Sequence, residues 1–286
     1  MDPLLLTAPV AYLFGFPLLV LASQKVNPDP RLDALDPAMW PPTVAQTMSR
    51  VEHDLYALGF SIVGRFALPN AMPDVSTMVT MLVNYKSGDK SMITAIWGNA
   101  GGFWLLKTHY TEFSTRFEDG HCFDTINSPV LPSFQVGPLD VKTRAPQLKE
   151  AAELWALHRY VMRKHGAQGR KVVYDAKDAA PYLRRIWRES FEEQVGFGRF
   201  RFNGKEFVPT VKGAYLMAWG QMWPMTMWIR ARMNAQSRAI VNEWKGAGQS
   251  GASPFADTAF DESRVKIQPE APLPAQAQGS PIPSPF

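Results

Sequence analysis

The sequence predicts an α+β protein with a transmembrane helix at its N-terminus, and three observations lead to this fold class. Twenty uncharged, mostly apolar residues form a run near the start of the chain. Residues 61–126 alternate apolar and polar side chains between turn sequences, which is typical of an antiparallel meander. The flanking segments repeat apolar residues at helical spacing, so we expect helices to pack against the sheet.

The apolar run, residues 4–23, is predicted to be a transmembrane anchor within residues 1–24. Twenty helical residues extend about 30 Å, the thickness of the hydrocarbon core of a bilayer. A buried helix and a signal peptide are the alternatives, although no basic region precedes the run. Lys25 and Arg31 follow it. We therefore expect the soluble part on the cytoplasmic side of the membrane.

Residues 25–42 are rich in Pro and Asp and are predicted to be a linker to a meander domain, residues 43–128. The domain begins with a helix from Thr43, a suitable N-cap, to Gly59. The apolar stripe of this helix comprises Val44, Met48, Val51 and Leu55.

About five antiparallel strands are expected after this helix. Four of them are the runs 61–68, 75–85, 92–97 and 103–117, and the fifth follows Asp119-Gly120. Asp-Gly favours a type I′ turn, whose two central residues both need positive φ. A two-residue loop would place Thr115 opposite Asp124 as a hydrogen-bonded polar pair. The core face would then carry Phe113, Phe117, Cys122 and Ile126.

Residues 129–212 are predicted to form a helical segment with a β-hairpin. The periodicity predicts helices over residues 147–164 and from about 178 to 196. Asn203-Gly204 is a second type I′ signal. The strands expected beside it are residues 199–202 and 205–208.

A second apolar stretch, rich in Trp, lies within residues 213–245. Its uncharged part, 213–229, extends about 26 Å as a helix, which is short for a span. Because cations flank both ends, we expect a helix in the membrane interface; a buried helix and a second span are the alternatives. The residues expected at the interface are Trp219, Trp223, Trp228, Arg230 and Arg232. Residues 246–286 contain seven Pro and are predicted to be a disordered tail.

Basic residues are concentrated in one part of the chain. Residues 142–245 contain 20 Lys and Arg against 9 Asp and Glu, although the net charge of the whole chain is only +4. With an anchor close by, the anionic inner leaflet is the expected partner of this region, and nucleic acid is the alternative.

Known enzyme motifs are absent: the sequence has no P-loop, no dinucleotide-binding glycine pattern, no HExxH and no GxSxG. Its one cysteine, Cys122, cannot form an internal disulfide or a cysteine-cluster zinc site. His121 would point to the opposite face of a strand from Cys122, as would His109 from Glu112. No catalytic residue, cofactor or metal is therefore predicted.

One local pattern resembles a DNA-binding family. Two predicted helices, a Gly-rich turn and a hairpin end in Thr210-Val211-Lys212-Gly213, an order similar to the recognition helix and wing of winged-helix transcription factors. The resemblance covers residues 147–213 and shows two clear helices where the family usually has three. It implies a basic patch that approaches phosphate, formed by Arg184, Arg185, Arg188, Arg199 and Arg201.

A second resemblance rests on three short segments: Ala67-Leu68-Pro69, residues 112–117 (EFSTRF) and residues 212–217 (KGAYLM). They are similar to segments of uncharacterised bacterial membrane-anchored proteins, which share the anchor, the middle domain and the Trp-rich distal helix. This resemblance implies a location at the inner membrane of a bacterium and implies no activity.

These observations predict a membrane-anchored binding or scaffold protein without catalysis of its own, as an accessory subunit of a membrane complex. Its partners would be the lipid bilayer and other membrane proteins. A membrane-tethered regulator that binds nucleic acid and a hydrolase of unrecognised type are the alternatives.

Overall fold

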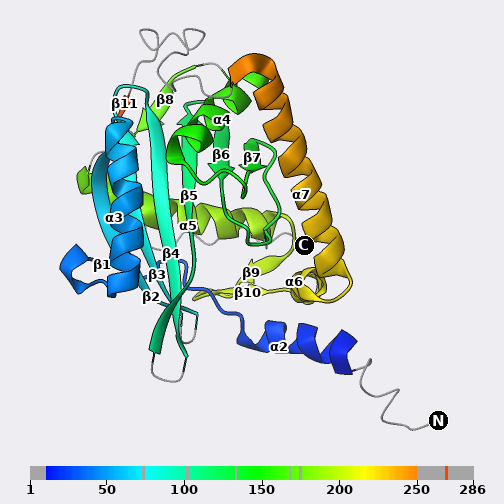
Figure 1. The fold of residues 1–286 in the computed structure, drawn as a ribbon. Coiled ribbons are helices and arrows are strands. Elements are labelled where there is room, and N and C mark those ends of the chain that lie inside the picture. Colours follow the sequence, from blue (N-terminus) through cyan, green and yellow to red (C-terminus); the bar gives the residue numbers. More distant parts are fainter. Residues whose placement is uncertain are drawn as a thin grey trace.

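A sheet with helices on both faces forms the centre of the protein in the computed structural model (Figure 1). The structure describes residues 11–72, 75–100, 103–132, 134–167, 169–173, 176–249 and 268–269. The predicted mixed α+β fold with a mostly antiparallel sheet is confirmed.

Nine described strands make up this sheet. They are β1 (Asp33–Ala34), β2 (Ser61–Met72), β3 (Val75–Asn84), β4 (Asp89–Ala100), β5 (Phe103–Phe117), β6 (Cys122–Ile126), β7 (Asp140–Arg144), β8 (Lys171–Val173) and β11 (Gln268–Pro269). Strands β1 to β7 follow one another in chain order, and each pair is antiparallel except β6 with β7. β8 pairs with the end of β5, and β11 pairs with β8.

Six described α-helices accompany the sheet. They are α2 (Phe16–Ser23), α3 (Pro42–Ala57), α4 (Ala151–Lys164), α5 (Ala179–Gly196), α6 (Val211–Gln221) and α7 (Met225–Trp244). α3 and α4 cover one face of the sheet and α5 covers the other, which gives three layers (Figure 1). A separate hairpin of β9 (Phe200–Phe202) and β10 (Phe207–Pro209) connects α5 to α6.

The alternation of side chains along the strands divides the core between the two faces. Leu82 and Phe113 pack with Trp155 of α4 on one face. Val83 packs with Leu183 of α5 on the other. Successive residues of a strand point to opposite faces, so the central strands need apolar residues at both parities to fill both layers.

The helices around the sheet largely follow the sequence prediction. α3 begins one residue before the predicted Thr43, and Gly59 follows it with a φ of 82°, a conformation that favours glycine. α4 begins at Ala151, later than the predicted residue 147, because residues 145–150 form turns. α5 lies where the periodicity places it.

The sequence does not predict β7, which runs parallel to β6 at the edge of the sheet. Its five residues, DVKTR, include one large apolar side chain, and pattern analysis relies on apolar alternation. The pairing places Lys142 beside Asp124.

The loop between β5 and β6 is longer than the two residues predicted at Asp119-Gly120. Arg116 pairs with Cys122, residues 118–121 connect β5 to β6, and Gly120 has a φ of 91°. Because alternate residues face opposite ways, a slip of one residue exchanges the two faces of a strand.

The predicted core face of this hairpin is therefore wrong. Thr115 lies opposite Phe123 instead of Asp124, on the face that carries Phe113. The α5 face of the sheet receives Cys122, Asp124 and Ile126. The β9–β10 hairpin differs in a similar way, because Phe202 pairs with Phe207 and leaves a four-residue loop.

The described part of the N-terminal apolar run forms a π-helical turn (Ala11–Gly15) and α2. Within the described residues, no helix combines the length and the apolar character needed to cross a bilayer. The predicted transmembrane helix is thus unsupported, and residues 4–10 of the run lie outside the described residues. α2 packs against α6, and Val26 and Phe207 exchange two backbone hydrogen bonds of 2.9 Å just after it.

The second apolar stretch forms two helices instead of the single helix predicted. α6 ends at Gln221, α7 begins at Met225, and Pro224 lies in the break. Proline has no N–H to donate within a helix, so Pro224 accounts for the position of the break. The predicted disordered tail, 246–286, lies outside the described residues except for residues 246–249 and β11.

Candidate functional site

Exposed apolar side chains of the N-terminal turn, α2, α6 and the start of α7 form what is termed the helical surface below. These elements lie together at one end of the protein (Figure 1). Its exposed large apolar residues are Tyr12, Leu13, Phe14, Leu18, Leu19, Tyr215, Leu216, Trp223, Met227 and Trp228. Trp223 is 71% exposed and Trp228 is 56% exposed, although aromatic side chains gain much from burial.

Contacts join the elements that carry the helical surface: α2 packs against α6, and α6 packs against α7. The backbone N–H of Trp223 donates to Tyr12 Oη at 3.0 Å, which joins the N-terminal turn to the break between α6 and α7. Tyr215 stacks on the partly buried Trp219, with ring centroids 5.9 Å apart. An exposed apolar patch of this kind marks a site of contact with a protein or a membrane.

Cations border the helical surface, and acids are absent from the same stretch of chain. The sequence has no Asp or Glu in residues 207–242. Lys212 and Arg230 are exposed, and the guanidinium of Arg232 lies 5.6 Å from the ring centroid of Trp228. The adjacent hairpin adds two further exposed cations, Arg201 and Lys205. The surface is therefore both apolar and positively charged.

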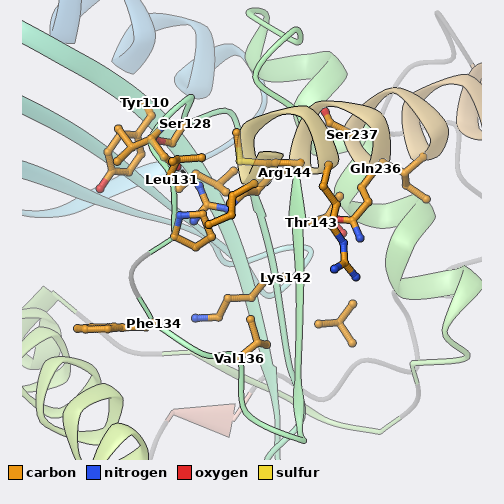
Figure 2. A pocket seen from close by; sticks show the side chains of 18 of the residues that line it. Tyr110, Ser128, Leu131, Phe134, Val136, Lys142, Thr143, Arg144, Gln236 and Ser237 are labelled. Atoms are coloured by element: carbon orange, nitrogen blue, oxygen red, sulfur yellow. Dashed lines mark hydrogen bonds between the residues drawn. The ribbon is translucent and has the colours of Figure 1, made fainter. Parts of the chain in front are cut away.

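A cavity of about 750 Å³, the α7 cavity, lies between α7, the edge strands β6 and β7, and the segment that contains Leu131 and Phe134 (Figure 2). Its volume falls in the range of about 300–1,000 Å³ that is typical of small-molecule sites. Much of its lining is apolar, including Ile126, Leu131, Phe134, Ile229, Met233 and Ile240.

The cations lining the α7 cavity are Lys142, Arg144 and Arg232, and no Asp or Glu is among its described lining residues. Figure 2 shows the ammonium of Lys142 pointing toward Phe134. Arg144 Nη1 donates to the Val130 carbonyl at 2.8 Å. Burial lowers the pKa of Arg144, although Glu112 and Tyr110 act in the opposite direction.

A second cavity of about 400 Å³, the α5 cavity, separates α5 from the sheet and has the opposite balance of charge. Its acids are Glu112, Asp124, Asp140, Glu189 and Glu193, and its cations are Lys90, Arg116 and Lys142. Arg116 Nη2 donates to Glu189 Oε2 at 2.9 Å. Lys142 Nζ lies 3.5 Å from Asp124 Oδ2, so Lys142 borders both cavities and has its acidic neighbour in this one.

Glu112 has a strongly perturbed carboxyl group. Burial, and then the negative charge of Asp124, raise the pKa of Glu112 to about 8 against the effect of Lys142 and Arg144. A carboxyl that remains protonated at neutral pH beside a charged carboxylate is an arrangement that enzymes use for general acid–base catalysis.

Cys122 is a buried thiol without the environment of a nucleophile. Burial raises its pKa to about 12, so little thiolate forms at neutral pH. Its Sγ donates to Asp124 Oδ1 at 3.5 Å. His121 Nδ1 lies 3.0 Å from Asp119 Oδ2 outside the strand, and His109 lies on the other face of the sheet.

A third polar group, the Asp89 cluster, lies in the core between the sheet and α4. Asp89 Oδ1 accepts hydrogen bonds from Lys171 Nζ at 2.7 Å and from Thr115 Oγ1 at 2.9 Å. Asp89 Oδ2 accepts from Trp155 Nε1 at 2.8 Å. His158 Nε2 lies 2.9 Å from Thr115 Oγ1. All five side chains are buried, so the cluster has no access for a ligand.

Within the Asp89 cluster, burial and the opposite charge of a neighbour act in opposite directions on the pKa of Asp89 and on that of His158. Burial would raise the pKa of Asp89, but Lys171 and then His158 outweigh it and hold the pKa below its usual range. Burial lowers the pKa of His158 to about 4 despite the attraction of Asp89. His158 is therefore neutral at pH 7, and the cluster serves to hold α4 and β8 against the sheet.

Most arginines of the predicted basic patch lie close to acidic side chains. Three of its arginines lie on α5, at 3.2–3.8 Å from carboxylate oxygens: Arg184 with Asp29, Arg185 with Glu189, and Arg188 with Glu192. Arg199 and Arg201 lie at the start of the hairpin instead. α4 and α5 pack on opposite faces of the sheet, so they do not form the single helical unit that the winged-helix resemblance implies.

Comparisons with known proteins give no relative: no family model, curated protein or solved structure matches the chain. Among the described residues, no group of three or more His, Cys, Asp or Glu side chains is placed to hold a metal ion.

Sequence analysis missed both cavities and the Asp89 cluster. The alternation of Lys142 and Arg144 with Val141 and Thr143 is the local signal that could have indicated a strand with one basic face. Asp89 and Lys171 are 82 positions apart, and no local pattern indicates that they pair.

Proposed function

We propose that the protein binds the surface of an anionic membrane through its helical surface and acts there as a binding or scaffold protein without catalysis of its own. The main support is the set of exposed apolar side chains on the helical surface, with exposed cations on the same elements and no acid in residues 207–242.

This composition fits the boundary between lipid headgroups and acyl chains. Trp is favoured at that depth because it joins an apolar ring system to a polar N–H. A large apolar side chain removed from water contributes about 1.5–3 kcal/mol, and a Lys or Arg near an anionic leaflet contributes about 1 kcal/mol. Several side chains of each kind suffice for attachment without a spanning helix.

The proposed location is the cytoplasmic leaflet of a bacterial inner membrane, with other membrane proteins as partners. The cations that follow the N-terminal apolar run favour this side of the membrane. Residues 4–10, which extend the run, would add to the attachment.

Sedimentation of the full-length protein with phospholipid vesicles tests the proposal. We expect binding to vesicles that contain phosphatidylglycerol, and we expect salt to weaken it. Trp223→Ala combined with Trp228→Ala should weaken binding about tenfold or more. The control, Tyr56→Ala, removes an aromatic side chain of α3 that is 53% exposed and should leave binding unchanged.

The electrostatic contribution is tested separately with Lys212→Gln and Arg230→Gln. These changes should weaken binding and reduce its salt dependence, whereas Arg50→Gln on α3 should do neither. Failure to bind anionic vesicles, or equal effects of the surface variants and their controls, would contradict the proposal.

An acid–base hydrolase is the second candidate, and the raised pKa of Glu112 in the α5 cavity supports it. A screen of esters and phosphoesters tests it. Activity that Glu112→Gln abolishes, and that Cys122→Ala and His109→Ala retain, would favour this candidate. No turnover of any tested substrate, or turnover that survives Glu112→Gln, would count against it.

A further inference from the structure

We propose that the α7 cavity binds an anionic amphiphile, a molecule with one apolar chain and a carboxylate or phosphate head, and that Lys142, Arg144 and Arg232 hold the head. The proposal extends the membrane function, since a bilayer would supply such a ligand. Binding itself does not depend on that function.

The apolar lining of the α7 cavity favours a chain-like ligand. Leu131 and Phe134 come from the segment before β7, Ile126 from β6, and Ile229 and Met233 from α7. Apolar side chains therefore lie on several sides of the space. A hydrocarbon chain placed among them would be removed from water.

The charges lining the α7 cavity favour an anionic head. The three cations lie in the same cavity, and no Asp or Glu is among its described lining residues. Lys142 has its acidic neighbour, Asp124, on the side of the α5 cavity, and Arg144 donates to the Val130 carbonyl, so an anionic head would supply the negative charge that the lining of the α7 cavity lacks. The α5 cavity differs in this respect because its carboxylates outnumber its cations. The shortage of negative charge is thus specific to the α7 cavity.

The position of Arg232 connects the cavity with the helical surface. Its guanidinium lies over the ring of Trp228, which is exposed on that surface, and the same residue lines the cavity. Ile229, the residue after Trp228, also lines the cavity. An amphiphile at the helical surface would therefore need to move only around the first turns of α7 to enter.

Isothermal titration calorimetry with the full-length protein tests the proposal, at ligand concentrations below those that form micelles. Oleate and 1-oleoyl lysophosphatidate share an apolar chain and differ in the head. Oleyl alcohol lacks the charge, and acetate and inorganic phosphate lack the chain. We expect at least one of the two oleoyl anions to bind about tenfold or more tightly than the alcohol, with no binding of the short anions.

Variants assign the binding to the α7 cavity. Arg144→Gln should weaken binding of the anion about tenfold and leave oleyl alcohol unaffected, whereas the control Arg50→Gln should change neither. If Arg144→Gln fails to fold, Arg232→Gln provides the same test from an exposed position on α7.

Two outcomes would overturn the proposal: equal affinity for oleate, lysophosphatidate and oleyl alcohol, or anion binding that survives both arginine variants. The test is independent of vesicle binding. The Trp223→Ala, Trp228→Ala variant should lose vesicle binding and retain oleate binding. Arg144→Gln should bind oleate more weakly and retain vesicle binding.

Discussion

The Asp89 cluster and the α7 cavity both hold charged side chains next to the same sheet, but only the cluster contains both signs of charge. Lys171 Nζ lies 2.7 Å from Asp89 Oδ1, and both side chains are almost fully buried. Lys142, Arg144 and Arg232 line the α7 cavity, whose described lining residues include no acid, and the acidic neighbour of Lys142 lies in the α5 cavity. Removing one partner of a closed, buried charge pair destabilises the fold, whereas cations lining an open cavity are available to a ligand.

This difference separates the expected effects of substitutions in the two regions. Changes in the Asp89 cluster should alter stability and leave binding intact. Changes in the α7 cavity or on the helical surface should alter binding and leave stability nearly intact. The four predictions that follow test this separation, from the largest effect on the free energy of unfolding to the smallest.

Asp89→Asn should have the largest effect. It leaves the ammonium of Lys171 buried without its counter-charge, which typically costs about 3–5 kcal/mol. Urea denaturation measures the loss of unfolding free energy, and Asp54→Asn on α3 serves as the control. A loss below about 1 kcal/mol would mean that the cluster is not a closed charge pair.

His158 should make the protein less stable in acid. Its folded pKa is lowered from 6.5 to about 4, so the unfolded state binds more protons between these values. The contribution of His158 to stability is present above pH 6.5 and falls as the pH decreases, so the native chain should lose about 2 kcal/mol relative to His158→Gln between pH 7 and pH 5. Urea denaturation of both proteins at both pH values measures this difference, in which the opposite contribution of Glu112 cancels. An unchanged pH dependence in the variant would contradict the assignment.

Glu112 should have the opposite pH dependence. Its folded pKa is raised from 4.5 to about 8, so the folded state binds more protons between these values, and its contribution is lost as the pH rises. Glu112→Gln should therefore gain stability relative to the native chain between pH 5 and pH 8. We expect on the order of 1 kcal/mol, because water in the cavity screens the charge. A relative loss over this range would reverse the sign and contradict the account.

Trp223→Ala with Trp228→Ala should have the smallest effect on stability. Both rings are more than half exposed, so their removal should change the unfolding free energy by less than about 0.5 kcal/mol while vesicle binding falls. A large loss of stability would show that the two rings support the fold. They would then have no separate role in binding.

Local patterns predicted the elements better than their pairing. The helical spacing of Val44 and Met48 located α3, and the Asp-Gly sequence located the turn after β5. The loop has four residues instead of two, and the one-residue slip moved Cys122 and Asp124 to the other face. Turn sequence alone does not determine loop length when the loop also packs against another element; Gly120 lines the α5 cavity.

The candidate site was predicted in part. Trp223 and Trp228 were selected from composition and flanking charge, which are local properties. The α7 cavity is lined by residues about 100 positions apart in the sequence, such as Leu131 and Met233. Such residues come together through the packing of whole elements, and single-sequence periodicity carries no information about that packing.

Quenching of tryptophan fluorescence by phospholipids brominated along their acyl chains tests the central claim most directly. The account predicts strong quenching of the full-length protein in anionic vesicles and its loss when Trp223 and Trp228 are both replaced by Phe. Fluorescence that is unaffected by the brominated lipids would place the helical surface outside the membrane and contradict the account.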